Sequence, residues 1–206
     1  MKITLFGASG RTGGHVLKLA LEKGHEITAF VRNSNKLNME HKNLSICQGD
    51  AFNTEDVEKA VKGADAVLGT IGTTSRAEST TVSRAMENII KAMEKHGVKR
   101  IISLSTMGAG ESMDYIGLVW RIFLKLLLSG PIRDHERHED LIRASSLDWT
   151  IIRPGALLSK PGTGRYTVGY NLGTGRICRE DLAEFMVKQL ETEEYLKMTP
   201  SIINVQ

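Results

Sequence analysis

The sequence predicts an α/β protein built on a parallel sheet that helices cover on both faces. Short apolar runs typical of buried strands alternate with amphipathic helical patterns along the whole chain. The first strand, at residues 3–6, is followed at once by a glycine-rich turn and a helical pattern. The chain has 206 residues, of which 41% are hydrophobic and 25% charged. This composition suits one globular domain, over residues 1–206, with a small C-terminal lobe.

The individual elements follow from the period of the apolar residues and from the residues that end each run. Strands are expected at 3–6, 26–31, 44–47, 65–68, 99–104 and 149–152. Helices are expected from 13 to 23, at 54–61, at 81–96, at 134–144 and around 182–190. Thr81 is expected to cap the third of these helices, and Gly97 to end it.

Three glycines, Gly7, Gly10 and Gly13, lie between the first strand and the first helix. Glycine permits a tight turn and a close approach of the backbone to a pyrophosphate, and the start of the helix offers unpaired N–H groups to phosphate oxygens. The arrangement therefore predicts a Rossmann-like, doubly wound sheet that binds a dinucleotide. An ordinary strand-to-helix turn without a ligand is the alternative. The loop residues expected to bind are Gly7, Ser9, Gly10, Arg11, Thr12 and Gly13.

The residue after the second strand indicates which dinucleotide is bound. Arg32 follows Val31, and the next acidic residue is Glu40. An acid at this place binds the ribose hydroxyls of NAD, whereas an arginine suits the 2′-phosphate of NADP. We therefore expect NADP(H) to be preferred over NAD(H). A solvated arginine at a strand end is the alternative.

Other strand ends supply further candidates, because ligands of open α/β sheets bind beyond the carboxyl ends of the strands. Asp50 is expected to accept a hydrogen bond from the adenine amino group, or else to form an Asx turn before the next helix. Gly72 is expected where the backbone passes beneath the cofactor. The full set of additional cofactor-binding candidates is Asp50, Ala51, Gly72, Thr73, Arg153, Pro154 and Gly155.

Composition argues against several other classes of protein. The net charge is +3 with acids and bases interspersed, so we expect no nucleic-acid partner, and the mild positive balance suits an anionic cofactor. Cys47 and Cys178 are far apart and form no C-x-x-C pair. His135 and His138 are one residue too close for H-E-x-x-H. No metal site is therefore expected, and these histidines are expected at the surface or at a pocket edge.

One apolar run, from Ile116 to Leu128, is too short to cross a bilayer and contains Arg121 and Lys125. We expect it to form a buried helix or one that faces a partner, and we expect no membrane partner. The N-terminus enters a strand directly, without a charged leader or cleavage site, so the expected location is the cytoplasm.

The chain resembles the biliverdin reductase B/flavin reductase family, an atypical, NmrA-like branch of the short-chain dehydrogenases/reductases. The resemblance extends from Lys2 to about Tyr195. The segments that carry it are Gly7–Gly13, Phe30-Val31-Arg32, Gly49-Asp50, Asp65-Ala66-Val67, Ile71-Gly72-Thr73, Ile152-Arg153-Pro154-Gly155 and Arg165-Tyr166-Thr167-Val168.

This resemblance implies a Rossmann fold that binds NADPH and passes hydride to a flavin, tetrapyrrole or quinone-like acceptor. It also implies that Thr106 and Ser105 are the catalytic hydroxyls near the nicotinamide, and that residues 153–155 brace the nicotinamide on the substrate side. The human-type biliverdin reductase has a histidine after paired prolines where this chain has Arg153-Pro154-Gly155. This departure argues against a tetrapyrrole.

The chemistry is further limited by the tyrosines, because none has a lysine four residues later. The Tyr-x-x-x-Lys pair that serves alcohol–ketone chemistry is therefore absent. Hydride transfer to a flavin does not need it, since the acceptor can take its proton from water. We expect an NADPH-dependent oxidoreductase of a small-molecule acceptor, a monomer or weak homo-oligomer. The alternatives are an NADP(H)-binding sensor without turnover and, disfavoured by the missing pair, an epimerase or dehydratase.

Overall fold

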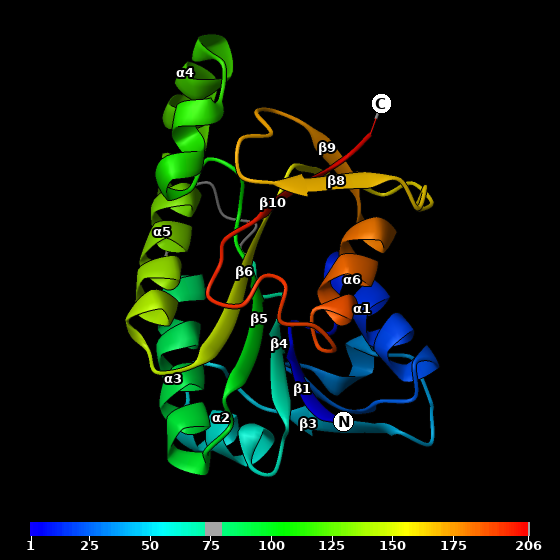
Figure 1. Cartoon of the computed structure of the whole chain (residues 1–206). Helices are drawn as coiled ribbons and strands as arrows, with labels where there is room; N and C mark the ends of the chain where they lie inside the picture. The colour runs from blue at the N-terminus through cyan, green and yellow to red at the C-terminus, as the bar shows by residue number, and fades with distance from the viewer. Residues whose placement is uncertain (73–79, 206) are drawn as a thin grey trace.

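An eight-stranded sheet forms the centre of the computed structural model, which describes residues 1–72 and 80–205 (Figure 1). The strand order is β3-β2-β1-β4-β5-β6-β10-β8. Neighbouring strands are parallel except β8, which is antiparallel to β10. The strands of this sheet are β1 (Lys2–Phe6), β2 (Glu26–Val31), β3 (Leu44–Gln48), β4 (Ala66–Gly69), β5 (Arg100–Leu104), β6 (Asp148–Pro154), β8 (Tyr166–Gly169) and β10 (Ser201–Asn204). The predicted Rossmann-like α/β fold is confirmed.

Helices cover both faces of the sheet, as the alternation of strands and helices requires. Helices α1 (Arg11–Glu22) and α6 (Arg179–Lys188) pack together on one face. Helices α2 (Thr54–Val61), α3 (Thr81–His96) and α5 (Ser129–Ala144) cover the other face (Figure 1). The central strands are buried on both sides, so their residues are mostly apolar without strict alternation, and Thr4 and Ser103 are the buried polar exceptions in β1 and β5.

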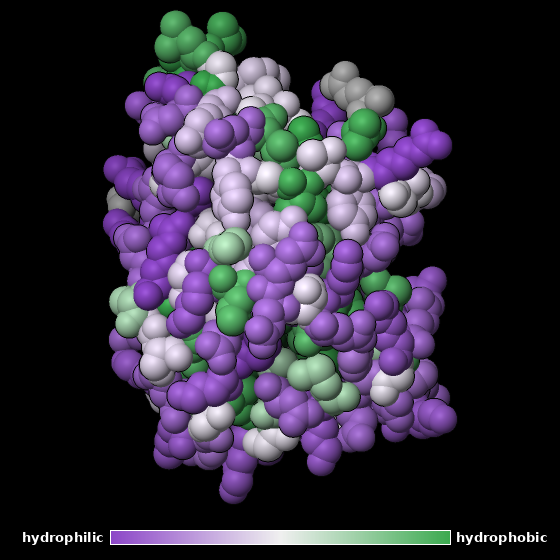
Figure 2. All heavy atoms as spheres, viewed as in Figure 1, coloured by the Kyte–Doolittle hydropathy of each residue, from purple (hydrophilic) through white to green (hydrophobic). Residues whose placement is uncertain are grey.

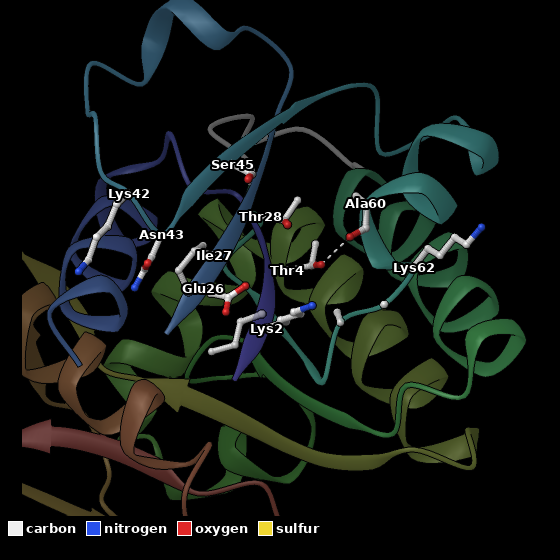
Figure 3. A pocket seen from close by; sticks show the side chains of 13 residues that line it. Lys2, Thr4, Glu26, Ile27, Thr28, Lys42, Asn43, Ser45, Ala60 and Lys62 are labelled. Carbon is white, nitrogen blue, oxygen red and sulfur yellow. Dashed lines mark hydrogen bonds between the residues drawn. The ribbon is translucent and has the colours of Figure 1, made fainter. Parts of the chain in front are cut away.

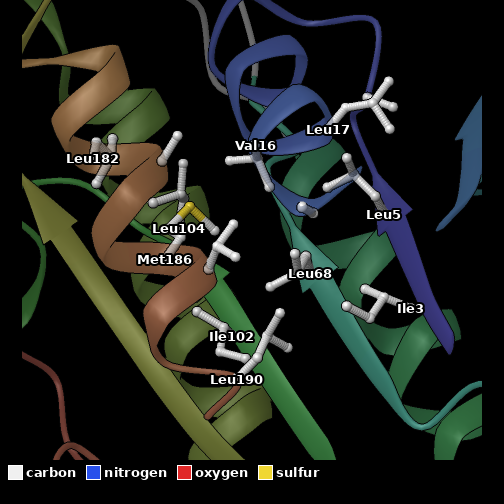
Figure 4. Close-up of a cluster of buried hydrophobic side chains, with 14 of the residues drawn as sticks. Ile3, Leu5, Val16, Leu17, Leu68, Ile102, Leu104, Leu182, Met186 and Leu190 are labelled. Atoms are coloured by element: carbon white, nitrogen blue, oxygen red, sulfur yellow. The ribbon is translucent and has the colours of Figure 1, made fainter. Parts of the chain in front are cut away.

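The apolar core beneath α1 and α6 positions the glycine loop. Val16 and Leu17 of α1 and Leu182 of α6 meet Leu5 and Leu68 of the sheet (Figure 4). All five side chains are completely shielded from solvent. Each such side chain stabilises the fold by about 1.5–3 kcal/mol through burial, so the start of α1 is held firmly against the end of β1.

The start of α3 differs from the expectation. Thr81 begins the helix but is not its cap, and Thr80 in the cap position makes no side-chain cap bond. The fully buried carboxylate of Asp134 on α5 accepts the N–H groups of Val82 and Ser83 at 2.9 and 3.0 Å, and the Ser83 hydroxyl at 2.6 Å. A residue 51 positions away therefore caps the helix, and the cap joins α3 to α5.

The regions after β5 and β6 contain the helix expected from the apolar run together with short elements that the sequence patterns did not predict. A 3₁₀ helix, η2 (Gly110–Tyr115), leads into α4 (Leu118–Leu127). None of the α4 residues is buried, so of the two alternatives expected for the apolar run the buried helix is wrong, and the helix that faces a partner stays a prediction. After β6, the short strands β7 (Ala156–Leu158) and β9 (Arg176–Cys178) pair in parallel. They form the small C-terminal lobe with β8.

Candidate functional site

The glycine loop has the geometry that its sequence predicts. Gly7 has a φ of +84°, which side chains disfavour, and a Cβ there would lie 2.7 Å from Thr70 Oγ1. A Cβ on Gly13 would lie 2.1 Å from the Gly7 carbonyl oxygen. The Gly10 N–H donates to that same oxygen at 2.9 Å. Only glycine fits at positions 7 and 13, because the backbone of the turn is packed against the start of α1.

The start of α1 is an open anion site. Gly10 occupies the N-cap position without a side-chain cap, and the first turn contains no acidic residue. The first N–H groups of a helix have no partner inside the helix, and the helix dipole adds partial positive charge there. Ser9, Gly10 and Arg11 are exposed at this point, whereas Thr12 and Gly13 are buried. The loop therefore presents main-chain donors to a phosphate group.

A second arginine, which the sequence analysis missed, lies beside the first. Arg179 begins α6 and is only 7% exposed. Its Nη1 donates to Ser159 Oγ at 2.7 Å, but its buried Nε has no hydrogen-bond partner. Burial lowers the pKa of Arg179, and the nearby charge of Arg11 lowers it further. Among residues 1–72 and 80–205, no carboxylate forms an ion pair with either guanidinium. The pair is suited to an anion.

The ends of β2 and β3 hold the next two candidates. Arg32 follows β2 directly and is exposed, as a group that binds an outer phosphate must be. Asp50 follows β3, where its Oδ1 accepts the Phe52 N–H at 3.0 Å. This is the Asx turn that the sequence analysis kept as the alternative to adenine binding. The neighbouring Ala51 carbonyl accepts Asn88 Nδ2 at 3.0 Å.

Beyond β4, the backbone turns at Thr70, whose hydroxyl donates to the Phe6 carbonyl at 2.9 Å. This bond joins the ends of β1 and β4 at the glycine loop. Gly72 is exposed, and open space surrounds the place of its missing side chain. The predicted contact at Thr73 lies outside the described residues.

Arg153, at the end of β6, lies inside the protein and is 2% exposed. Its Nε and Nη2 donate to the two carboxylate oxygens of Glu139 at 2.9 and 2.6 Å. Its Nη1 lies 2.9 Å from Glu111 Oε1, and Arg143 lies 3.0 Å from Glu139. Burial alone would lower the pKa of Arg153, but the hydrogen bonds to the two glutamates raise it overall. The side chain of Arg153 therefore binds within the protein, and its backbone N–H donates to the Pro200 carbonyl at 2.9 Å.

The backbone of the 153–155 segment is also tightly placed. The Pro154 carbonyl accepts the Met107 N–H at 3.2 Å, and the Gly155 N–H donates to the Ile202 carbonyl at 3.0 Å. A Cβ on Gly155 would lie 2.6 Å from the Gly175 carbonyl oxygen. Gly155 thus lets the small C-terminal lobe pack against the end of β6.

The two predicted catalytic hydroxyls differ in their surroundings. Ser105 is 5% exposed, and its hydroxyl donates to Glu139 Oε1 at 2.5 Å. Its proton is therefore directed into the Arg153 cluster. Thr106 is half-buried, and its hydroxyl makes only a long contact, 3.3 Å, to the Met107 carbonyl. Thr106 is thus the hydroxyl of the pair with a free capacity to bind a ligand.

The expectation that the histidines lie at the surface or a pocket edge is wrong for His138. His138 is fully buried, and its Nε2 lies 2.8 Å from Ser103 Oγ on β5. Burial, together with the neighbouring His135, lowers the pKa of His138 to about 3. The helical patch that sequence spacing placed on the surface instead faces the sheet, so His138 is neutral and structural near pH 7.

A polar pocket of about 350 Å³ opens at the opposite end of the sheet (Figure 3). Lys2, Glu26 and Asn43 line it, and in its wall Thr4 Oγ1 donates to the Ala60 carbonyl at 2.6 Å. These residues lie at the amino ends of β1, β2 and β3. None of the predicted site residues lines this pocket, and ligands of open α/β sheets bind at the carboxyl ends. The candidate site is therefore the glycine-loop end.

A family model described as NAD(P)H-binding matches residues 7–193 of the chain. The chain is 30% identical over 199 residues to the "Uncharacterized sugar epimerase YhfK" of Bacillus subtilis, covering 93% of this chain and 88% of that protein. The matched range begins at Gly7 and includes the glycine loop, Arg32 and the Arg153 segment.

Two solved structures support the same assignment of fold. The oxidoreductase ylbE of Lactococcus lactis superimposes with a TM-score of 0.85 at 26% identity, covering 100% of this chain and 92% of that one. ChuY of Escherichia coli O157:H7, described as an anaerobillin reductase, superimposes with a TM-score of 0.83 at 24% identity, covering 99% and 97%. None of the helices in the described ranges is long and apolar enough to cross a bilayer.

Proposed function

The chain belongs to the NAD(P)H-binding family, and from this premise we propose that it is an NADPH-dependent reductase of a flavin or quinone-like acceptor. The observation that carries the proposal is the glycine-loop end of the sheet. There, the uncapped start of α1 lies beside two guanidinium groups, of Arg11 and Arg179, that have no carboxylate partner in the part of the chain that the structure describes. A ligand with a pyrophosphate and a further phosphate matches this charge.

Each part of the proposed site contacts a different part of the dinucleotide. The N–H groups at the start of α1 hold the pyrophosphate, with Arg11 and Arg179 at its side. Arg32 binds the 2′-phosphate with its planar fork, which favours NADP(H) over NAD(H). Thr106 lies at the end of β5, where the nicotinamide end of an extended dinucleotide reaches. When bound, the dinucleotide supplies the hydride.

The hydrogen-bonded cluster of Arg153, Glu139 and Ser105 positions the end of the site where the nicotinamide and the acceptor would bind. The Ser105 hydroxyl donates its hydrogen bond to Glu139, so the lone pairs of the Ser105 oxygen are left to accept from the amide N–H₂ of a nicotinamide. Thr106 is free to orient the carboxamide or the acceptor. Residues 153–155 brace the same end through backbone, because the Arg153 side chain is held by Glu139. The proton that follows the hydride comes from water, since α5 carries no tyrosine or lysine.

The experiment is a panel of acceptors tested with NADPH and with NADH. Riboflavin, FMN, a short-chain quinone and biliverdin are offered to the wild type and to Arg32→Ala. We expect oxidation of NADPH with a flavin or quinone, and a selective loss of NADPH use in Arg32→Ala of about 10- to 100-fold in kcat/KM, the size of one charge-assisted contact. Arg165→Ala, an equally exposed arginine next to β8, serves as the control.

A sensor that binds NADP(H) without turnover is the second candidate. It is favoured by the absence of a tyrosine–lysine pair and by the neutral, buried His138, which leave α5 without a proton donor at the site. Tight NADPH binding by calorimetry together with no oxidation by any acceptor would select the sensor and remove the reductase.

A further inference from the structure

Helix α4 projects from the end of the molecule at which β7, β8 and β9 also lie (Figure 1). Val119 is 80% exposed, Leu126 77% and Leu118 70%, and Figure 2 shows hydrophobic side chains gathered at this tip. The other large apolar residues that α4 exposes are Trp120, Ile122, Phe123 and Leu127. A soluble surface rarely leaves so many large apolar residues together without a binding partner.

The charge around this helix is of one sign. Residues 115–133, which contain α4, have three basic residues and no acidic one. Residues 149–179, which contain β7, β8 and β9, have five basic residues and no acidic one. All 24 acidic residues of the chain therefore lie outside these two stretches. The net charge of the whole chain is only +3, but the part of the molecule formed by these two stretches is strongly basic.

The two stretches meet in space. The chain enters α4 from the carboxyl end of β5 and enters β7 from the carboxyl end of β6, and a Cβ on Gly173 would lie 3.4 Å from the Tyr115 carbonyl oxygen. We call residues 115–133 and 156–178 together the basic lobe. Its exposed cations are Lys125, Arg133, Lys160, Arg165 and Arg176.

Acidic residues border the basic lobe without neutralising it. Asp114 lies 4.0 Å from Arg121. Glu180 accepts the Gly162 N–H at 2.6 Å, and Asp181 accepts the Thr163 N–H at 2.9 Å. These two carboxylates at the start of α6 thus bind backbone of the lobe, and the lysines and arginines named above are exposed to solvent.

We propose that the basic lobe docks on an anionic phospholipid bilayer, with the apolar residues of α4 inserted at the headgroup boundary. Trp, Phe and Leu beside Lys and Arg on a helix are the composition of interfacial helices. Each basic residue near an anionic leaflet adds attraction that salt screens. The proposal does not rest on the reductase function, and it departs from the expectation of no membrane partner, which followed from the length of the apolar run alone.

Two other occupants fit the surface less well. A second copy of the chain would bring two basic lobes together, and like charges across an interface oppose association. A folded protein partner covers one side of a helix, whereas the exposed residues of α4 point in several directions around its axis. A bilayer, in contrast, surrounds an inserted helix on all sides, and an anionic bilayer complements the positive charge of the basic lobe.

The test is flotation of the purified protein with vesicles, in the absence of any nucleotide or acceptor. We expect binding to vesicles of phosphatidylcholine with 30% phosphatidylglycerol, and at least about tenfold weaker binding to phosphatidylcholine alone. Raising the salt from 50 to 500 mM should release the protein, because the Debye length then falls to a few ångströms. Omitting the nucleotide separates this outcome from that of the reductase assay.

Three variants locate the surface. Val119→Glu with Leu126→Glu should lower binding about hundredfold or more, since two apolar insertions become repelling charges. Lys125→Gln with Arg133→Gln should lower it about 25-fold, at about fivefold for each charge removed. Ile46→Glu, at an exposed apolar position on the edge strand β3, is the matched control and should bind like the wild type. A circular dichroism spectrum checks that each variant is folded.

The outcomes are distinguishable. Binding that requires phosphatidylglycerol and is lost in the α4 variant but not in Ile46→Glu supports the proposal. Absence of vesicle binding overturns it. So does a wild-type dimer in analytical ultracentrifugation that Val119→Glu with Leu126→Glu dissociates while vesicles do not bind, since a second copy then covers α4.

Discussion

Arg153 and Arg179 are both buried near the carboxyl end of the sheet, yet their surroundings are opposite. Arg153 shares hydrogen bonds with Glu139 and Glu111, and its charge is balanced inside the protein. Arg179 has an unpaired Nε and the positive charge of Arg11 beside it. A buried charge needs a partner. The partners of Arg153 belong to the fold, whereas Arg179 has no carboxylate partner among the described residues, and we propose that a ligand supplies its anion.

The largest effect on stability is expected when the ion pair between Glu139 and Arg153 is broken. Glu139→Gln removes the buried one of the two carboxylates opposite Arg153 and leaves the buried guanidinium paired with the exposed Glu111 alone. We expect the free energy of unfolding to fall by about 3–5 kcal/mol, measured by urea denaturation. Glu191→Gln removes a solvent-exposed charge and should change stability by less than about 1 kcal/mol. A loss as small in Glu139→Gln would mean that Arg153 is not held by this pair.

Two neighbouring glycines in α1, Gly13 and Gly14, test whether the anion site beside Arg179 depends on a tightly packed backbone. Gly13→Ala places a Cβ against the Gly7 carbonyl oxygen, which must move the loop away from its present geometry. We expect NADPH affinity to fall about hundredfold in a calorimetric titration, the cost of displacing the loop by about 1 Å.

Gly14→Ala is the matched control, because its Cβ would meet nothing within 4 Å. It should keep its affinity and gain about 0.5–1 kcal/mol of stability, since alanine favours a helix interior. Equal affinities in the two variants would contradict a tight backbone site.

His138 is a third buried basic side chain. Unlike Arg153 and Arg179 it is neutral near pH 7, so it needs no compensating charge. Its folded pKa of about 3 is below the unfolded value of 6.5, so the unfolded chain binds the proton more readily. Stability is therefore complete above pH 6.5 and is lost as the pH falls toward 3. We expect this residue to account for up to about 2.5 kcal/mol of the stability lost between pH 7 and pH 4.5. His138→Gln should flatten that part of the profile in urea titrations at several pH values, and an unchanged slope would contradict it.

The smallest effect is expected from replacing Arg179 itself. Arg179→Met removes a charge that the protein does not compensate, so the stability of the nucleotide-free protein should stay the same or rise slightly. NADPH affinity should fall about tenfold, the value of a charge-assisted hydrogen bond. The two measurements together separate this residue from Arg153. A large loss of stability with unchanged affinity would make Arg179 structural.

The sequence predicted the glycine loop well because its constraints are local. Gly7 and Gly13 are six positions apart, and the steric contact between them lies within one turn of strand and helix. Periodicity likewise predicted the strands of the central sheet. The antiparallel β8 and the last strand β10 were not predicted. Like β4 they have four residues, but β4 begins as a continuous apolar run, whereas β8 and β10 mix polar and apolar residues and show no clear pattern.

The site was predictable only in part, because charges are paired by tertiary structure. Glu139 and Arg153 come from different elements, and nothing in their spacing indicates that they meet. Arg179 reaches the glycine loop only because α6 packs against α1. The apolar run of α4 predicted a helix, but a run that is apolar on most sides does not reveal whether it lies inside or outside the protein.

The trans-cap at Asp134 and the Ser105–Glu139 bond fix the two ends of the segment between β5 and α5. Everything from residue 107 to residue 128 is thus a cassette suspended between anchors that the rest of the fold already stabilises. Its first part is tied to the core, because Ala109 and Ile116 are buried and Glu111 pairs with Arg153. Helix α4 contains no buried residue, so it is the part that protein engineers can exchange for that of a relative, or lengthen, with little cost to folding.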